Sequence, residues 1–359
     1  MLITISTMKL YVDYYCEIAN ILVPWTVQQF YGFEKLTIES DAIYIVGRIQ
    51  LRDNAEQIRR IVTERTARVI FSNPAEGSET FVQHLRLYGV EDLVLAGLLP
   101  VVVGGAVPDK YPHILYEHFL TQPFRYEENC QAANRIGEIF EKKHKPYKFL
   151  FLNGRYRSHR RVLLHEFKQR GLLAQALWTN LDAQHIPIHL LPPKYEVEQF
   201  QSHMATSAQG FVKAELFNNT WGEIYIRSEP YIDTYFSVVT ETVFNYPYSF
   251  RTEKIAKPLT QGHPWICAAN QGFYKDMHNL GFQTFGHVID ESFDQIENNQ
   301  DRIARIAAVV DDLCSQDMLQ LLKECENVCK YNQQHLLTMS QQWQLEFPAR
   351  FLDFLAKHP

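Results

Sequence analysis

The stretch SFRTEKIAKPLTQGHPWICAANQG, residues 249–272, contains a polar turn, a short helix, a glycine turn and a buried strand in succession. Thr252 is placed to cap the helix, because its hydroxyl can accept a hydrogen bond from an unpaired amide of the first turn. The apolar run 264–269 fits a strand that is covered on both faces. We therefore expect Glu253 and Lys254 to lie at the edge of a parallel sheet, where open α/β sheets bind ligands.

Upstream, residues 148–171 are expected to begin a second α/β unit with a strand, the loop NGRYRS and a helix that ends at a glycine. Strands and helices also alternate through about the first 140 residues, which is typical of a doubly wound parallel sheet. The sequence thus predicts an α/β fold. The predicted strands are 8–12, 42–46, 69–71, 93–95, 101–103, 148–152, 176–179, 223–227, 235–240 and 264–269.

A charged, proline-containing segment at residues 138–148 is the predicted domain boundary. We expect two Rossmann-like doubly wound domains that face a cleft, the first over residues 1–145 and the second over 146–330. Residues 331–359 are predicted to form a C-terminal helix that packs back across the cleft.

The net charge of the chain argues against some classes of binding partner. The 359 residues carry 35 Lys and Arg against 41 Asp and Glu, a net charge of −6 with a pI near 6.2. A field of this sign does not attract nucleic acid or anionic lipid, so recognition of a phosphate must depend on a local cluster of cations. The uncharged, largely apolar run 93–108 is shorter than a membrane span and is broken by Gly and Pro, so membrane contact is expected to be peripheral at most.

The six cysteines form no CxxC pair and have no histidine partner at zinc spacing. We interpret them as reduced thiols packed in the core, which fits a cytoplasmic protein. The first twenty residues lack a basic segment followed by a clean apolar run, so no signal peptide is expected.

The segment NGRYRSHR, residues 153–160, is the first candidate site. A helix that begins after this loop offers free amides and the positive end of its dipole, both of which suit a phosphate. Arg160 shares a helix face with apolar residues three, four and seven positions later, so it is expected to point inward, where only an anion compensates it. Arg155 and Arg157 are weaker candidates for the same anion. The alternative is a solvated basic helix face.

The second candidate site joins VVTETVF, residues 238–244, to the stretch quoted above. Glu241 follows a strand and Glu253 begins a helix, positions from which carboxylates commonly accept ribose hydroxyls. Lys254 could neutralise a departing diphosphate as a point charge. The alternative is that Glu253 and Lys257 merely form an exposed pair along the helix.

The third candidate site is SNPAEGSETF, residues 72–81, at a strand end of the first domain. Glu76 is placed there as a general base that would deprotonate an acceptor hydroxyl. Helix capping by Ser78 or Glu79 explains the same residues equally well. The chain has no DxD, GxxxxGK[ST], HExxH or GxSxG motif, which argues against a metal-bridged diphosphate site, a P-loop, a zinc protease and an α/β-hydrolase. No metal site is predicted.

These segments together resemble a known family. ETVFNYPYSFRTEKIAKPLTQGHPWIC is similar to the donor-binding signature of the α1,3-fucosyltransferases, and LNGRYRSHRRVLLHEF is similar to the strand–helix unit that precedes it. Residues 281–294 also resemble a segment of uncharacterised bacterial and viral proteins assigned as glycosyltransferases. The resemblance covers about residues 148–313. The family's tyrosine just before the Thr-Glu-Lys core is not matched in place, and Tyr248 lies slightly upstream.

The resemblance implies a GT-B fold and a metal-independent, inverting transfer of a sugar from a nucleotide sugar, without a further cofactor. By this resemblance, Arg160 and Lys254 would bind the diphosphate of the donor and Glu253 would bind its ribose. Glu241 would also contact the donor. The donor would lie in the second domain and the acceptor, a glycan or another hydroxyl compound, in the first.

The sequence therefore predicts a glycosyltransferase of the hexosyl- or fucosyltransferase type. It leaves the sugar, the acceptor and the nucleotide open, with a GDP-sugar as one candidate. The alternatives are a nucleotide-sugar-binding protein without catalysis and a sugar-nucleotide epimerase on the same scaffold.

Overall fold

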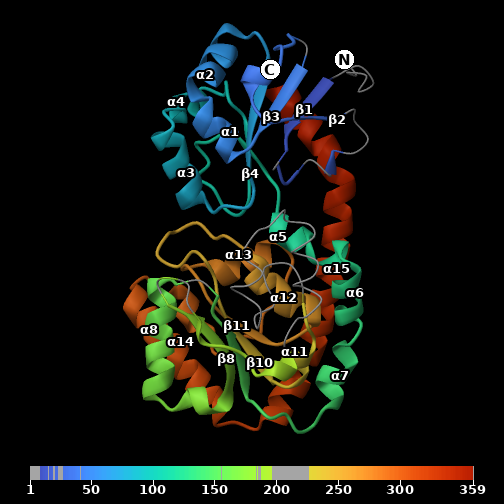
Figure 1. Ribbon diagram of the computed structural model, residues 1–359. Coiled ribbons are helices and arrows are strands. Elements are labelled where there is room, and N and C mark those ends of the chain that lie inside the picture. The colour runs from blue at the N-terminus through green and yellow to red at the C-terminus, as the bar shows by residue number, and fades with distance from the viewer. Residues whose placement is uncertain are drawn as a thin grey trace. The chain divides into compact units, whose positions relative to one another are not determined.

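The computed structural model describes residues 9–14, 16–18, 21–22, 27–40, 42–154, 156–182, 184, 187–195 and 226–358. The chain divides into two compact units, which Figure 1 colours along the sequence. Unit 1 comprises Met1–His118 together with Gln341–Pro359, and unit 2 comprises Phe119–Ser340. The predicted ranges 1–145, 146–330 and 331–359 do not coincide with these units.

Unit 1 is built on a six-stranded parallel sheet with the order β2-β1-β3-β4-β5-β6. Its elements are β1 (Lys9–Asp13), β2 (Val27–Phe30), η3 (Phe33–Lys35), β3 (Ala42–Val46), α1 (Arg48–Asp53), α2 (Ala55–Glu64), β4 (Arg68–Asn73), α3 (Ser78–Leu87), α4 (Glu91–Leu95), β5 (Val101–Val103) and β6 (His113–Leu115). The predicted α/β class with a parallel sheet is confirmed.

Both faces of this sheet are covered. Successive residues of β3 point to opposite faces, so that Ile43 and Ile45 pack in one core while Tyr44 and Val46 pack in the other. Helices α1, α2 and α3 contribute to the second core, and the end of the last helix contributes Phe347 and Phe351 to the first. Strands buried on both faces read as continuous apolar runs, which is why the sequence shows them clearly.

One predicted strand of unit 1 is wrong. Residues 93–95 lie in helix α4, whose first turn carries Glu91 and Asp92. Carboxylates at that position are favourable because they face the positive end of the helix dipole. Three apolar residues do not distinguish a short strand from a buried helical turn.

Unit 2 contains a five-stranded sheet with the order β11-β10-β7-β8-β9, parallel except for β9, which pairs antiparallel with β8. Of the predicted strand 223–227, only Ile226 and Arg227 lie among the described residues, and neither is in a strand. The elements of this unit are α5 (His118–Thr121, beginning in unit 1), η4 (Pro123–Arg125), α6 (Glu127–Ala133), α7 (Ile136–Glu141), β7 (Phe149–Leu152), α8 (Ser158–Gln169), η5 (Leu172–Gln175), β8 (Ala176–Leu181), β9 (Pro187–His189), η6 (Pro193–Tyr195), α11 (Glu229–Ile232), β10 (Phe236–Thr240), α12 (Glu253–Gln261), β11 (Trp265–Ala268), α13 (Phe273–Asn279), η7 (Ser292–Gln295) and α14 (Asn299–Cys314).

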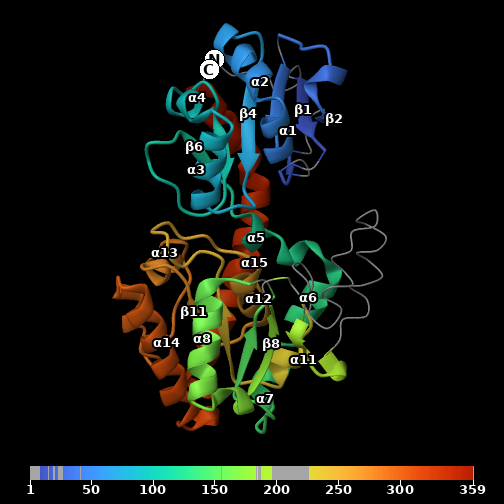
Figure 2. The ribbon, with the colours of Figure 1, turned by 60° about the vertical axis from the view of Figure 1, so that its left-hand side comes forward.

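Helices α8 and α14 lie side by side along the sheet of unit 2 in both views (Figures 1 and 2), while α12 contacts β10 and α6. The last helix, α15 (Met318–Lys357), has 40 residues and supplies side chains to both units, because the division falls within it after Ser340. It begins earlier than the predicted C-terminal helix. None of the helices in the described ranges is long and apolar enough to cross a membrane.

Candidate functional site

The carboxyl ends of β7 and β10 form the topological switch point of unit 2. These strands are neighbours, yet the chain leaves β7 through α8 toward β8 on one side and leaves β10 through α12 toward β11 on the other. Ligands of open α/β sheets bind outside the strand ends at such a point. The predicted site segment 153–160 directly follows β7, and Glu241, from the predicted segment 238–244, directly follows β10.

Asn153 connects strands β7, β8 and β10 by hydrogen bonds near this edge. Its backbone N–H donates to the Thr179 hydroxyl oxygen at 3.1 Å, and its side-chain Oδ1 accepts a 2.7 Å hydrogen bond from the hydroxyl of Thr240. Thr179 belongs to β8 and Thr240 ends β10, while Asn153 follows β7. The three residues are buried, so the loop that leads into α8 starts from a fixed point.

Arg160 points inward, as its helix face predicted, and only 2% of its surface is exposed. Its Nη2 donates to the backbone carbonyl of Thr240 at 3.0 Å and to that of Glu241 at 3.4 Å. The first turn of α8 is thereby joined to the end of β10. The guanidinium lies at the positive end of the α8 dipole, an arrangement that favours the binding of an anion there.

Glu241 is fully buried and bonds to the start of α12. Its carboxylate accepts hydrogen bonds from the backbone N–H of Thr252 at 2.9 Å, from the Thr252 hydroxyl at 2.7 Å and from the backbone N–H of Thr242 at 3.0 Å. Burial raises the pKa of this carboxyl group, and the positive charge of Lys254 opposes the shift. Glu241 therefore fixes the entrance of α12 relative to β10.

Thr252 caps α12, as predicted, and accepts a hydrogen bond from the backbone N–H of Lys254 at 3.3 Å. The Lys254 ammonium donates to the Thr252 hydroxyl at 3.1 Å and pairs with the carboxylate of Glu253. The side chains of Lys254 and Glu253 are 23% and 16% exposed. The lysine thus keeps contact with solvent at the switch point while its position is fixed by the cap.

In the segment that follows Glu241, the ring of Phe244 packs against the side chains of His159 and Arg302. The His159 ring lies parallel to the Phe244 ring with centroids 4.9 Å apart, and the Arg302 guanidinium carbon lies 4.4 Å from the Phe244 centroid. His159 Nε2 donates to the Glu241 carbonyl at 2.9 Å, and Arg302 donates to the Phe244 carbonyl at 2.8 Å. Burial, together with the charge of Arg160, lowers the pKa of His159 to about 3, so this imidazole is neutral.

The remaining predicted donor residues lie nearby or outside the described ranges. Tyr248 is half-buried, and its ring contacts that of Tyr246 with centroids 5.5 Å apart. Arg157 is exposed and precedes the first turn of α8. Arg155 lies outside the residues that the structure describes.

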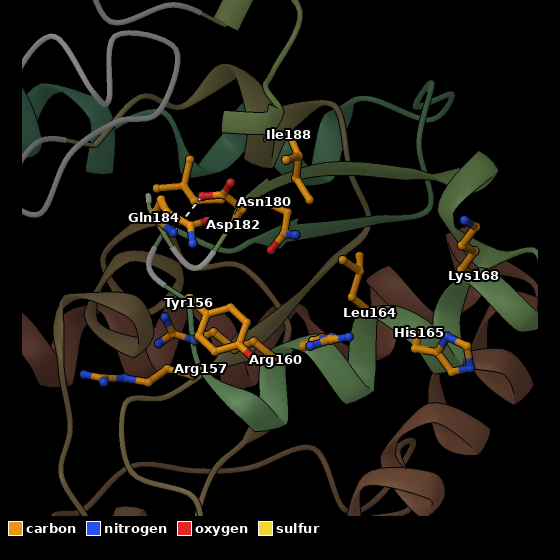
Figure 3. Close-up of a pocket in the computed structure, with 12 residues that line it drawn as sticks. Tyr156, Arg157, Arg160, Leu164, His165, Lys168, Asn180, Asp182, Gln184 and Ile188 are labelled. Atoms are coloured by element: carbon orange, nitrogen blue, oxygen red, sulfur yellow. Dashed lines mark hydrogen bonds between the residues drawn. The ribbon is translucent and has the colours of Figure 1, made fainter. Parts of the chain in front are cut away.

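A groove of about 440 Å³ runs beside α8 toward β8 and β9. Figure 3 shows side chains of α8 along one side, among them Arg157 and Arg160, and those of Asn180, Asp182 and Ile188 on the other. Both cations belong to the first turn of the helix or its cap, so the groove borders the N-terminal end of α8. The sequence pattern indicated the helix but gave no signal for the opposite wall.

The predicted base, Glu76, lies between β4 and α3 in unit 1. Its carboxylate is 3.7 Å from Nη1 of Arg48, and its side chain is 39% exposed. A second carboxyl group, Glu17, follows β1 and interacts electrostatically with Asp13, Glu76 and Arg48. Burial raises the pKa of Glu17 to about 7, the range in which a carboxylate acts as a general base at neutral pH. Sequence reasoning missed Glu17.

Arg160, Glu241, Glu253 and Lys254 are thus brought together in unit 2, and Glu76 belongs to unit 1. Among the described residues, no group of three or more His, Cys, Asp or Glu side chains is arranged to hold a metal ion. A scan against protein-family models gave no match to this chain, and a search of curated proteins found no relative.

Proposed function

We propose that the chain is a glycosyltransferase of the GT-B class, which transfers a sugar from a nucleotide-sugar donor to an acceptor hydroxyl. The observation that supports it most strongly is that Glu241 connects two cations at the switch point. Its backbone carbonyl accepts from buried Arg160, and its carboxylate accepts from Thr252, the helix cap to which Lys254 also bonds. Two helices begin at this point, and their free amides add to the positive potential of both side chains.

The donor's diphosphate would lie against Arg160 and Lys254. When the sugar leaves, negative charge develops on the diphosphate oxygen, and cations already fixed in place stabilise that charge without reorganising. Arg160 is fixed by the carbonyls of Thr240 and Glu241, and Lys254 by the hydroxyl of Thr252. The transfer would need no metal ion, because the two side chains supply the positive charge.

The acceptor would bind to unit 1, whose carboxyl groups supply the base. The acceptor oxygen attacks the anomeric carbon as its proton passes to a carboxylate, and the bond from that carbon to the diphosphate oxygen breaks. A single displacement of this kind inverts the anomeric configuration. Glu76 and Glu17 are the two candidate bases, and Glu17 has the pKa that suits the role.

Two carboxylates of unit 2 are candidates for accepting the ribose hydroxyls. Glu253, which the resemblance favours, begins α12, whereas Asp182 directly follows β8. The proposal does not specify the nucleobase or the sugar of the donor.

A thermal-shift screen with GDP, UDP, CMP and dTDP and their sugars tests the donor site, followed by a transfer assay with the sugar nucleotide that stabilises most. Transfer to an acceptor supports the proposal. Stabilisation without turnover favours a nucleotide-sugar-binding protein, and an altered donor without an acceptor favours an epimerase. No stabilisation by any compound would contradict the donor site.

A further inference from the structure

The groove beside α8 has two walls of different chemistry. One wall is cationic: Arg157, Arg161 and Lys168 are exposed, line the groove and occupy one face of α8 and its cap. Across from α8 lies Ile188 of β9, which is 61% exposed although it is a large aliphatic residue (Figure 3). Tyr156 also lines the groove and is 36% exposed. A solvated basic helix face would explain the cations, but not the apolar side chains that are open to solvent in the same groove.

The three residues of the cationic wall have no acidic partner. No carboxylate in the described part of the chain lies within ion-pairing distance of their side chains, whereas Arg170, which follows α8, pairs with Glu166 and Asp311. Of the described residues that line the groove, only Asp182 is acidic. The whole chain has a net charge of −6, so the groove is a local positive region that favours an anionic partner.

The length of the cationic wall indicates a chain-like partner. An α-helix rises about 1.5 Å per residue, so Arg157 and Lys168 are about 16 Å apart along the helix axis. One phosphate or diphosphate group is too short to contact both. An extended peptide rises about 3.3 Å per residue, so about five residues cover this length. Its successive side chains point to opposite sides, so that acidic ones can face the cationic wall while apolar ones face Ile188.

Other polyanions match the two walls less well. A nucleic acid presents phosphates along its length, but the net charge of −6 opposes its approach, and it leaves the exposed apolar side chains of the groove without a fixed counterpart. A membrane surface is flat, so it would contact the rim of a groove and not both of its walls. The charge and the apolar surface together favour a peptide.

We propose that the groove beside α8 binds an acidic segment of a partner protein, held in an extended conformation with acidic and apolar side chains in alternation. Its carboxylates pair with Arg157, Arg161 and Lys168, and its apolar side chains pack against Ile188. This interaction goes beyond the proposed transferase and does not depend on it, because Arg161 and Lys168 lie outside the proposed donor site.

The test begins with a pool of octapeptides in which Asp or Glu alternates with Val, Ile, Leu or Phe. Peptides retained by the immobilised full chain are identified by mass spectrometry, and the tightest is titrated by fluorescence anisotropy. Its affinity should decrease as the salt concentration rises, because exposed ion pairs are screened. A counterpart with Lys at each acidic position should not bind. A counterpart with Ser at each apolar position should bind about tenfold more weakly, because it buries less apolar surface.

A pair of double variants separates the groove from the general charge of the chain. Arg161→Gln with Lys168→Gln should weaken binding of the selected peptide about tenfold, because two ion pairs are lost. Arg170→Gln with Arg305→Gln is the control, since it removes the same charge from ion pairs outside the groove and should change the affinity less than about twofold.

Ile188→Ser tests the apolar wall and should reduce the affinity to about that of the serine counterpart. Arg161, Lys168 and Ile188 are exposed, so these substitutions should leave the fold intact.

The proposal is overturned if no peptide of the pool is retained, or if the groove variant and the control variant bind the peptide equally well. Equal affinity for the serine counterpart would also overturn it, because the arginines and the lysine would then form only a solvated basic face. Oligothymidylate and phosphatidylserine vesicles are titrated in parallel. If either binds through Arg161 and Lys168 while the peptides do not, the groove takes that partner instead. Sugar transfer is measured separately, so none of these outcomes decides the proposed function.

Discussion

Nη2 of Arg160 donates a hydrogen bond of 3.0 Å to the backbone carbonyl oxygen of Thr240. The bond joins the first turn of α8 to the last residue of β10, two elements separated by about eighty residues in sequence. It fixes the direction of a buried positive charge at the switch point of unit 2. A neutral side chain could fill the same space, but it would offer nothing to an anion.

Arg160→Met tests this charge. Loss of the two hydrogen bonds to carbonyls should lower the free energy of unfolding by about 1–3 kcal/mol, and nucleoside diphosphate affinity should fall about tenfold or more. Thermal unfolding and calorimetry measure the two effects separately. Arg170→Met is the control, because Arg170 pairs with Asp311 and Glu166 away from the switch point, where exposed pairs contribute little. Unchanged nucleotide affinity in Arg160→Met would contradict the diphosphate site.

Lys254→Met removes the second cation and keeps most of the side-chain volume. If Lys254 stabilises the departing diphosphate, kcat of sugar transfer should fall roughly a hundredfold, as it does when a preorganised donor to a developing anion is removed. Lys257→Met, one turn later on α12, is the matched control and should leave kcat within about twofold, because the proposed diphosphate site does not include Lys257. Equal losses in both variants would show that the effect is structural.

Thr252→Val tests the connection between Glu241 and α12. The substitution keeps the β-branched shape but removes the hydroxyl, so α12 loses its cap and the buried carboxylate loses one of its donors. We expect a loss of about 1–3 kcal/mol in the free energy of unfolding. In Thr242→Val the backbone N–H of residue 242 still donates to Glu241. The free energy of unfolding should therefore fall by less than about 1 kcal/mol. Denaturant titration of both variants measures the difference.

The sequence pattern was sufficient for features that depend on local spacing. Arg160 was predicted to point inward because its face of α8 is shared with apolar residues, and Thr252 was predicted as a cap because a helix follows it directly. The α/β class was predicted because strands buried on both faces alternate with amphipathic helices. In each case the information lies within one or two helical turns of the residue concerned.

Features that depend on contacts across the sheet could not be predicted. The hydrogen bond between the carboxylate of Glu241 and Thr252, eleven residues later, was not predicted, because the two residues are joined by a loop with no regular period. The contact of Glu241 with the donor stays a prediction. The opposite wall of the groove comes from β8 and β9, whose register with α8 is set by tertiary packing. Glu17 has an unusual environment only because the ends of β1 and β4 and the start of α1 meet at one edge of the sheet.

Glu17 and Glu76 can be distinguished as the acceptor base by their glutamine variants. If Glu17 accepts the proton, kcat/KM of wild type should increase with pH up to about 7, where Glu17 becomes ionised. Glu17→Gln should then reduce transfer about a hundredfold or more and remove that dependence. Glu76→Gln should retain the pH profile. If instead Glu76→Gln abolishes transfer and Glu17→Gln keeps the wild-type profile, the base is Glu76, as the sequence predicts.

The raised pKa of Glu17 also makes stability depend on pH. The folded protein keeps the proton up to about pH 7, whereas the unfolded chain releases it near 4.5, the ordinary pKa of a glutamate side chain. The unfolded state therefore binds fewer protons between these values, so the free energy of unfolding falls as pH rises from about 4.5 to 7. Glutamine cannot ionise, so Glu17→Gln avoids this loss. Because each pKa unit corresponds to about 1.4 kcal/mol, its free energy of unfolding at pH 8 should exceed that of wild type by about 1–3 kcal/mol. At pH 4 folded wild type and the variant both carry a neutral side chain at position 17, so their free energies of unfolding should differ little. A stability difference that is the same at both pH values would show that the pKa of Glu17 is the same in the folded and unfolded protein, and would contradict the raised pKa.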